Sequence, residues 1–133
     1  RTYAIGLAAF SVSTTGVLAF QTEGDASTQF AWFDRTGKQQ ETVGAPGSYR
    51  YPALSPDGKR LVYSNLADGE LWILDMTRRI TSKFTSSPTI EASPLWSVDG
   101  GTIFYRTTPG SETPAGIFEK SASGAVAATK TCE

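Results

Sequence analysis

A repeat of 42 residues constrains the fold of this chain more than any other feature of its sequence. The repeat is anchored by three equally spaced glycines, Gly16, Gly58 and Gly100. A serine stands three positions before each glycine, and an apolar run follows each of them. Self-similarity at a fixed period predicts a tandem array of one structural unit. We place the three units at residues 1–43, 44–85 and 86–133.

Each unit carries the pattern of four short antiparallel β-strands. The first strand ends at the serine, and the second follows the glycine as a nearly continuous apolar run such as Leu61–Tyr63, which is typical of an interior strand. The third strand is rich in aromatic and β-branched residues and ends at a short polar residue, as in Leu71–Asp75. The fourth strand is more polar, as in Lys38–Val43, which indicates the edge of a sheet. The sequence therefore predicts an all-β fold.

The anchoring glycines are predicted to lie in hairpin turns between the first two strands. In Pro56-Asp57-Gly58 the proline presets its own φ, the aspartate can hydrogen-bond the backbone of the turn, and the glycine adopts a positive φ. The third unit keeps the aspartate and the glycine, and the first unit keeps only the glycine. The predicted structural turn residues are Gly16, Asp57, Gly58, Asp99 and Gly100.

Four strands in about 42 residues are typical of a β-propeller blade. The run Pro52–Tyr63, followed by Leu71–Asp75, resembles the WD-repeat-like blades of the TolB-type propeller superfamily, and Pro94–Ser97 is similar to the start of the same core. The resemblance implies a β-propeller of which this chain holds about three blades, half of a six-bladed ring. The first unit departs most from the pattern, because it has neither the proline nor the aspartate of the core.

Three phrases of the sequence support a narrower resemblance. Phe10–Phe20, Trp32–Lys38 and Tyr51–Arg60 are similar to the propeller that follows the kinase domain in many bacterial eukaryote-like Ser/Thr protein kinases. This resemblance implies an extracytoplasmic binding or sensory module of a kinase-like receptor. Two alternatives stay open, namely the accessory propeller of a serine peptidase and a free periplasmic TolB-like interaction protein. The chain itself has none of the sequence motifs of a kinase catalytic domain.

The composition excludes most catalytic chemistry. The chain has no histidine and a single cysteine, Cys132, so that it cannot form a Ser-His-Asp triad, a Cys-His pair or an internal disulfide. It also lacks the G-x-S-x-G motif of the α/β-hydrolases. A formal net charge of −1 argues against nucleic-acid binding. No apolar run reaches the length of a membrane span. We therefore expect a chain without enzymatic activity, cofactor, metal or membrane insertion.

Binding is expected at the loops that share one end of the predicted blades. In a propeller, the connections between units and the hairpins between second and third strands lie on the same face, and loops on a rigid scaffold commonly carry recognition. Within these loops, Tyr49-Arg50-Tyr51 forms an aromatic and basic cluster suited to a peptide or a carbohydrate. The candidate partner-contacting residues are Tyr49, Arg50, Tyr51, Asp68, Glu91 and Arg106.

Other conspicuous side chains are assigned structural roles. Trp32, Trp72 and Trp96 lie within strand patterns, which favours packing between blades over ligand stacking. Asp34 and Asp75 occupy equivalent turn positions, which favours turn capping over acid-base chemistry. The pair Lys59-Arg60 is interpreted as a solvated strand end.

Three blades alone would leave two blade faces without a neighbour. Propellers usually contain four to eight blades, and exposed apolar faces act as contact surfaces. We expect such faces to be covered either by remaining blades of a longer chain or by a second copy that closes a ring head to tail.

Overall fold

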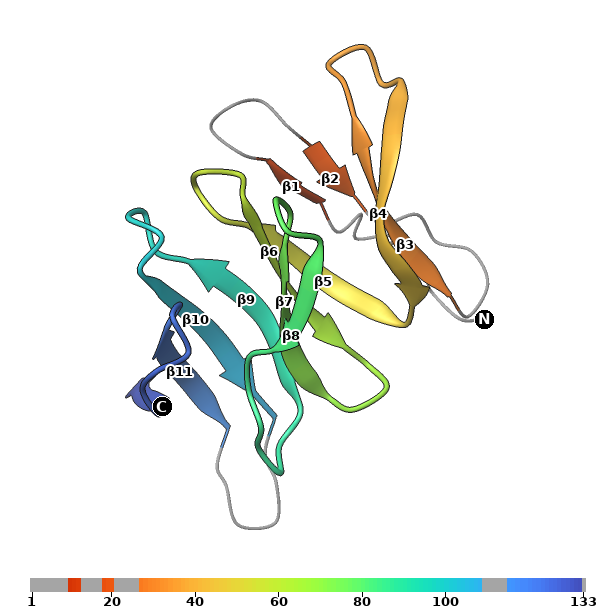
Figure 1. The fold of residues 1–133 in the computed structure, drawn as a ribbon. Helices are drawn as coiled ribbons and strands as arrows, with labels where there is room; N and C mark the ends of the chain where they lie inside the picture. The colour runs from red at the N-terminus through yellow and green to blue at the C-terminus, as the bar shows by residue number, and fades with distance from the viewer. Residues whose placement is uncertain (1–9, 13–17, 21–26, 109–114, 133) are drawn as a thin grey trace, which may run out of the picture.

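The computed structural model describes residues 10–12, 18–20, 27–108 and 115–132 (Figure 1). In these residues the chain forms strands and no helix, in three sheets of four strands each. The first sheet contains β1 (Phe10–Val12), β2 (Leu18–Phe20), β3 (Thr28–Phe33) and β4 (Gln39–Gly47). The second contains β5 (Tyr49–Leu54), β6 (Arg60–Asn65), β7 (Glu70–Asp75) and β8 (Ile80–Lys83). The third contains β9 (Glu91–Trp96), β10 (Thr102–Thr107), β11 (Gly116–Ser121) and β12 (Thr129–Cys132).

Strands that follow one another in the chain are neighbours in each sheet, and every pair is antiparallel. The prediction of an all-β fold built from four-stranded antiparallel units is therefore confirmed. The expected boundary at residue 43 falls inside β4, because β4 continues to Gly47 and pairs there with Thr28. The Thr28 hydroxyl also donates to the Gly47 carbonyl over 2.9 Å, which holds this extension in place.

The turns between the first two strands of the second and third sheets have matching geometry. Gly58 and Gly100 have φ values of 69° and 70°, a region that favours glycine because it has no Cβ. The Gly58 N–H donates to the Ser55 carbonyl over 2.8 Å, and Gly100 repeats this bond to Ser97 over 2.9 Å. Gly16 lies outside the described residues.

The repeated serines complete these turns from within. The Ser55 hydroxyl donates to Asp57 Oδ1 over 2.6 Å and accepts from the Arg60 N–H over 2.9 Å. Ser97 makes the same two bonds, to Asp99 Oδ1 over 2.6 Å and from Thr102 N–H over 2.9 Å. Serine therefore recurs because its hydroxyl bridges the two strands across the turn.

The first strands of the second and third sheets share an irregularity. The register shifts between β5 and β6 and between β9 and β10. Tyr51 and Ser93, which stand 42 residues apart, have φ values of 53° and 55°. A side chain at positive φ is uncommon, and its recurrence at equivalent positions indicates a bulge that belongs to the unit.

Two apolar clusters join the three sheets. One lies between the first and second sheets and contains Phe30, Val43, Leu54, Leu61, Tyr63 and Leu74. The other lies between the second and third sheets and contains Ala53, Val62, Leu71, Phe84, Trp96, Ile103, Tyr105 and Ala122. The second sheet is thus covered on both faces, as Figure 1 shows. Its strand β6 alternates between the two clusters, with Leu61 and Tyr63 on one side and Val62 on the other.

Candidate functional site

The connections at one end of the second and third sheets are joined by backbone hydrogen bonds. The Glu91 N–H donates to the Gly69 carbonyl over 2.8 Å, which ties the β8–β9 connection to the β6–β7 hairpin. The Thr108 N–H donates to the Ile90 carbonyl over 2.9 Å and adds the end of β10. Gly69 has a φ of 74°, and a Cβ there would lie 3.4 Å from Ile90 Cγ1. These connections form one ordered end, in the lower half of Figure 1, which we call the loop end.

Two buried carboxyl groups lie beneath the loop end. Glu70 begins β7 and is 4% exposed, and Glu91 begins β9 and is 2% exposed. Glu70 Oε2 accepts from the Thr85 hydroxyl over 2.9 Å, and Glu70 Oε1 accepts from the Ser87 N–H over 3.0 Å. Lys83 Nζ lies 3.7 Å from the same Oε1. The charge of Glu70 is therefore balanced by hydrogen bonds and a nearby ammonium group.

Glu91 has no ion pair among the described residues. Burial raises the pKa of Glu91 to about 7, the negative charge of Glu70 adds to the rise, and the Thr85 and Ser87 side chains oppose it. Glu91 Oε2 has no hydrogen-bond partner among the described residues, and neither has Oγ1 of Thr107, the residue opposite Glu91 in the sheet. Glu91 therefore carries a proton through the acidic range. Both carboxyl groups are shielded from solvent. Protonation of Glu91 therefore affects the packing of the connections at the loop end and not a ligand at the surface.

The exposed rim of the loop end carries a second ionic cluster. Lys83 Nζ lies 3.1 Å from Asp68 Oδ2, and the Trp72 indole N–H donates to the same oxygen over 3.1 Å. Partial burial works against ionisation of Asp68, but hydrogen bonds from Lys83, the Glu70 N–H and Trp72 outweigh it and lower its pKa. The rim can thus present a charged pair to a partner, but the pair is already satisfied within the chain.

The structure brings only some of the candidate partner-contacting residues together. Asp68 and Glu91 belong to the loop end, Asp68 at its exposed rim and Glu91 buried within it. Arg106 is exposed on β10, in register with Ala92, two strand positions before the loop that follows Thr108. Residues 109–114 of that loop lie outside the described part of the chain.

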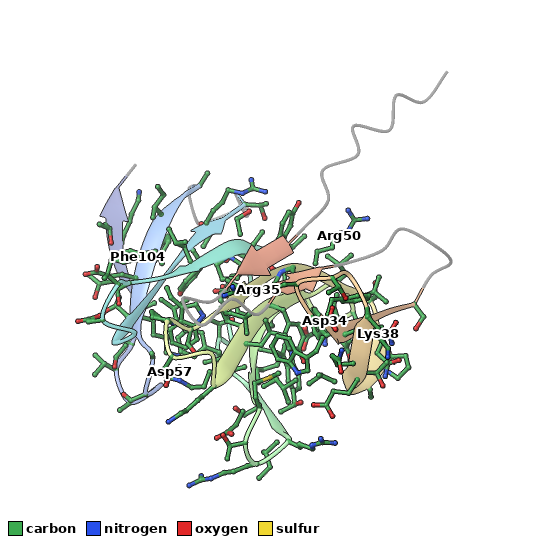
Figure 2. The ribbon with its side chains drawn as sticks, turned by 90° about the horizontal axis from the view of Figure 1, so that it is seen from above. Asp34, Arg35, Lys38, Arg50, Asp57 and Phe104 are labelled. Carbon is green, nitrogen blue, oxygen red and sulfur yellow. The ribbon has the colours of Figure 1, made fainter. Side chains whose placement is uncertain are left out.

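The cluster Tyr49-Arg50-Tyr51 was expected in a loop, but it lies in β5. The reason is that β4 continues to Gly47 and β5 begins at Tyr49, so that only Ser48 separates them. Tyr49 turns inward and stacks on Phe30 with ring centroids 5.3 Å apart. Arg50 and Tyr51 are exposed, and Figure 2 shows Arg50 projecting away from the sheets.

Aspartates at the ends of the third strands cap turns. Asp34 Oδ1 accepts from the backbone N–H of Thr36 over 2.9 Å and from that of Lys38 over 3.1 Å, and Asp34 and Lys38 lie together in Figure 2. Asp75 Oδ1 accepts from the Thr77 N–H over 2.9 Å. Among the described residues, no group of three or more cysteine, aspartate or glutamate side chains is placed to hold a metal ion.

The interpretation of Arg60 as a solvated strand end is wrong. Its guanidinium lies 4.5 Å from the centre of the Trp96 ring and donates to the carbonyls of Gly100 and Ala122 over 3.0 and 3.3 Å. Lys120 crosses the same interface in the opposite direction and donates to the Phe84 carbonyl over 2.7 Å. No local pattern could reveal these contacts, because each joins residues at least 36 positions apart.

No protein-family model matches this chain. Among solved structures it is similar to TolB from Acinetobacter baumannii, with a TM-score of 0.70 and 18% identity over 92% of this chain and 31% of the other. It is similar to a putative TolB from Agrobacterium tumefaciens, with a TM-score of 0.76 and 14% identity over 90% of this chain and 47% of the other. The β-propeller domain of the trilobed protease from Pyrococcus furiosus matches with a TM-score of 0.59 and 14% identity, over 93% of this chain and 42% of the other.

These likenesses show the fold, which is that of β-propeller blades. The chain spans about a third to a half of the length of the propeller chains it matches. The described residues include no helix with the length and apolarity that a membrane crossing requires.

Proposed function

We propose that this chain is part of a larger β-propeller and acts as a non-catalytic binding or sensory module outside the cytoplasm, in a bacterial Ser/Thr protein kinase-like receptor. The absence of histidine and of kinase and hydrolase motifs supports a non-catalytic role. The propeller fold supports a scaffold that displays loops to a protein, peptide or carbohydrate partner. The near-neutral charge argues against nucleic acid as that partner.

The exposed outer face of the third sheet is the main support for the proposal that this chain is part of a larger β-propeller. Leu95 is 65% exposed and stands 42 residues after Ala53, which is only 9% exposed because the third sheet covers it. Ile117 is 47% exposed and holds the position in β11 that the fully buried Leu71 holds in β7. Phe104 lies opposite Leu95 on this face, and Figure 2 shows it at the side of the molecule. The third sheet thus exposes the face that the second sheet buries against a neighbour.

The occupant of this face is a further blade of the parent chain. The matched propeller chains are two to three times as long as this chain, which leaves length for such blades. A second copy of this chain, joined head to tail, is the other arrangement that would cover the face.

Sedimentation across a concentration series tests this part of the proposal. The unaltered chain is expected to self-associate, and Leu95→Glu or Ile117→Glu is expected to reduce the association. Val126→Glu is the matched control, since Val126 is 62% exposed but lies outside the strands. Weak, open-ended association supports the proposal that a further blade of the parent chain covers this face. A discrete dimer would instead indicate that a second copy of this chain covers it. A monomer at all concentrations would contradict an uncovered interface.

An accessory propeller of a serine peptidase is the second candidate function. It is favoured by the similarity to the propeller domain of the trilobed protease. The parental reading frame decides between the two. An upstream kinase domain followed by an apolar segment of membrane-spanning length supports the receptor, whereas a downstream G-x-S-x-G motif supports the peptidase. A signal peptide without either domain would support a free periplasmic protein.

A further inference from the structure

A pocket between the first and second sheets has the features of a small-ligand site. Its volume is about 260 Å³, and it lies between β4 and the strands β6, β7 and β8. Phe30, Tyr49, Tyr63, Trp72, Asn65 and Thr81 contribute the side chains that define its chemistry. Thr81 is exposed, so the pocket opens to solvent along β8. This pocket is distinct from the buried carboxyl pair, neither member of which lines it.

Aromatic rings form two walls of the pocket. Phe30, Tyr49 and Tyr63 make a compact cluster with ring centroids 4.8 to 5.3 Å apart. Trp72 stands opposite Tyr63 in the β6–β7 register and therefore on the same face of the second sheet. Its indole N–H is held by Asp68, which fixes the orientation of the ring. Phe30 and Tyr63 are buried, at 5% and 3% exposure, so the half-buried rings of Tyr49 and Trp72 supply the aromatic surface that a flat, apolar ligand face can reach.

Polar groups converge on the same space. The Thr81 side chain hydrogen-bonds Tyr63. Burial is the main cause that raises the pKa of the Tyr63 phenol to about 12, so this group stays protonated at neutral pH. Asn65 Oδ1 accepts from the Ala67 N–H over 3.0 Å, which directs the oxygen into the turn and leaves the side-chain NH₂ group as a donor. A ligand in the pocket would therefore meet hydroxyl groups and an amide donor beside the rings.

The charge and size of the pocket narrow the ligand class. No aspartate, glutamate, lysine or arginine lines it, and Lys83 and Asp68, which contact the Trp72 side chain, are already paired with each other, so the pocket favours a neutral ligand. Its volume lies just below the range of about 300 to 1,000 Å³ that is typical of sites for drug-sized ligands. The lining therefore suits one small, neutral ring with an apolar face and hydroxyl groups at its edge.

We infer that this pocket binds a single neutral pyranose ring. The C–H face of a pyranose packs on aromatic rings, and its hydroxyl groups match the Thr81 hydroxyl and the Asn65 amide. This inference rests on the proposed binding role and names a ligand class and a site for it. It differs from the expectation for Tyr49-Arg50-Tyr51, since Arg50 and Tyr51 do not line the pocket.

Proton–nitrogen NMR of the whole chain provides a test with a local readout. Methyl β-D-glucopyranoside and N-acetylglucosamine are titrated separately, with glucuronate as a charged probe and p-cresol as a mimic of an aromatic side chain. We expect either neutral sugar to shift the Trp72 indole N–H and the Asn65 side-chain NH₂ signals, and glucuronate to bind more weakly. Binding of p-cresol with no response to the sugars would overturn the pyranose assignment.

Matched variants on β8 locate the binding. Thr81→Val removes one hydroxyl at nearly constant volume and is expected to weaken sugar binding about fivefold, the value of one hydrogen bond. Ser82→Ala, on the next residue of the same strand, does not line the pocket and is expected to leave binding unchanged. Shifts confined to Gly69 and Ile90 would reject the pocket while leaving a binding role at the loop end. No response to any sugar would reject the inference altogether. The proposed binding function would not be rejected by that result, because the parent protein could bind its partner at another site.

Discussion

The guanidinium of Arg60 lies 4.5 Å from the centre of the Trp96 ring and joins the second sheet to the third. Trp96 reaches back across the same interface, because its indole N–H donates to the Ala53 carbonyl over 2.9 Å. The two residues therefore form a reciprocal link. Each side chain hydrogen-bonds the backbone of the neighbouring unit, and the two side chains pack against each other. Blade-to-blade contact in this chain is thus polar as well as apolar.

Arg60→Lys is expected to lower the free energy of unfolding by about 1–2 kcal/mol, because an ammonium group cannot stack on Trp96 and also reach the two carbonyls that the planar guanidinium reaches. Urea denaturation measures the loss. Lys59→Ala, at the exposed neighbouring position, serves as the control and should change stability by less than about 0.5 kcal/mol. Equal effects of the two substitutions would show that the link contributes nothing.

Gly58→Val is expected to destabilise the chain more than Asp57→Asn. Valine at a φ of 69° meets a backbone conformation that costs on the order of 1–2 kcal/mol for residues with a Cβ. Asparagine keeps an oxygen that can accept from Ser55 and from the Lys59 N–H, as Asp57 does. Thermal unfolding of the two variants gives the order, and a larger loss for Asp57→Asn would refute this account of the turn.

Stability is expected to fall between about pH 4.5 and pH 7 through Glu91. The folded-state pKa of about 7 exceeds the ordinary value of 4.5, so the folded chain binds more protons than the unfolded chain in this range. The unfolding free energy therefore decreases as the pH rises, by a total on the order of 3 kcal/mol. The groups around Glu91 are Glu70 and Tyr105, with Lys83 and Asp68 beyond Glu70.

Glu91→Gln should remove this decrease and make the chain more stable than the unaltered form at pH 8. Denaturation at a series of pH values measures it. Glu41→Gln is the control, because Glu41 is an exposed residue paired only with Arg79 among the described residues. An unchanged pH profile in Glu91→Gln would assign the titration to another group.

Ser93 tests the bulge that recurs in the first strands. Its φ of 55° suits asparagine better than a β-branched residue. Ser93→Val is expected to cost about 1–2 kcal/mol in unfolding free energy, whereas Ser93→Asn should be close to neutral. Ser82→Val, at an exposed position in β8, supplies the control for adding valine to a strand. Equal tolerance of valine at both positions would argue against a constrained bulge.

The pattern of strands could be read from the sequence because it depends on neighbours in the chain. The apolar runs after the glycines became β6 and β10, and the aromatic run Leu71–Asp75 became β7. The extent of β4 could not be read in this way. It depends on Thr28, which lies 19 residues before Gly47 and anchors it through a side-chain hydrogen bond.

Three of the six candidate partner-contacting residues, Tyr49, Arg50 and Tyr51, were expected in a loop that proved to be a strand. Tyr49 was expected to face a ligand in that loop, but it lies against Phe30 and Tyr63 and lines a different space. Glu91 was placed in the expected connection, but its burial beside Glu70 had no signal in the sequence. Two carboxylates 21 residues apart in the chain give no indication that folding will enclose them together.

The repeat, the all-β class and the positions of the turns were determined by the sequence alone, because strand alternation and positive φ at glycine are local properties of the chain. Only the tertiary structure decided which side chains meet across the sheets: Arg60 with Trp96, Glu70 with Glu91, and the rings that surround the pocket beside Thr81. These contacts arise when neighbouring sheets pack face to face. Such packing brings together residues whose separation along the chain carries no information about their distance in space.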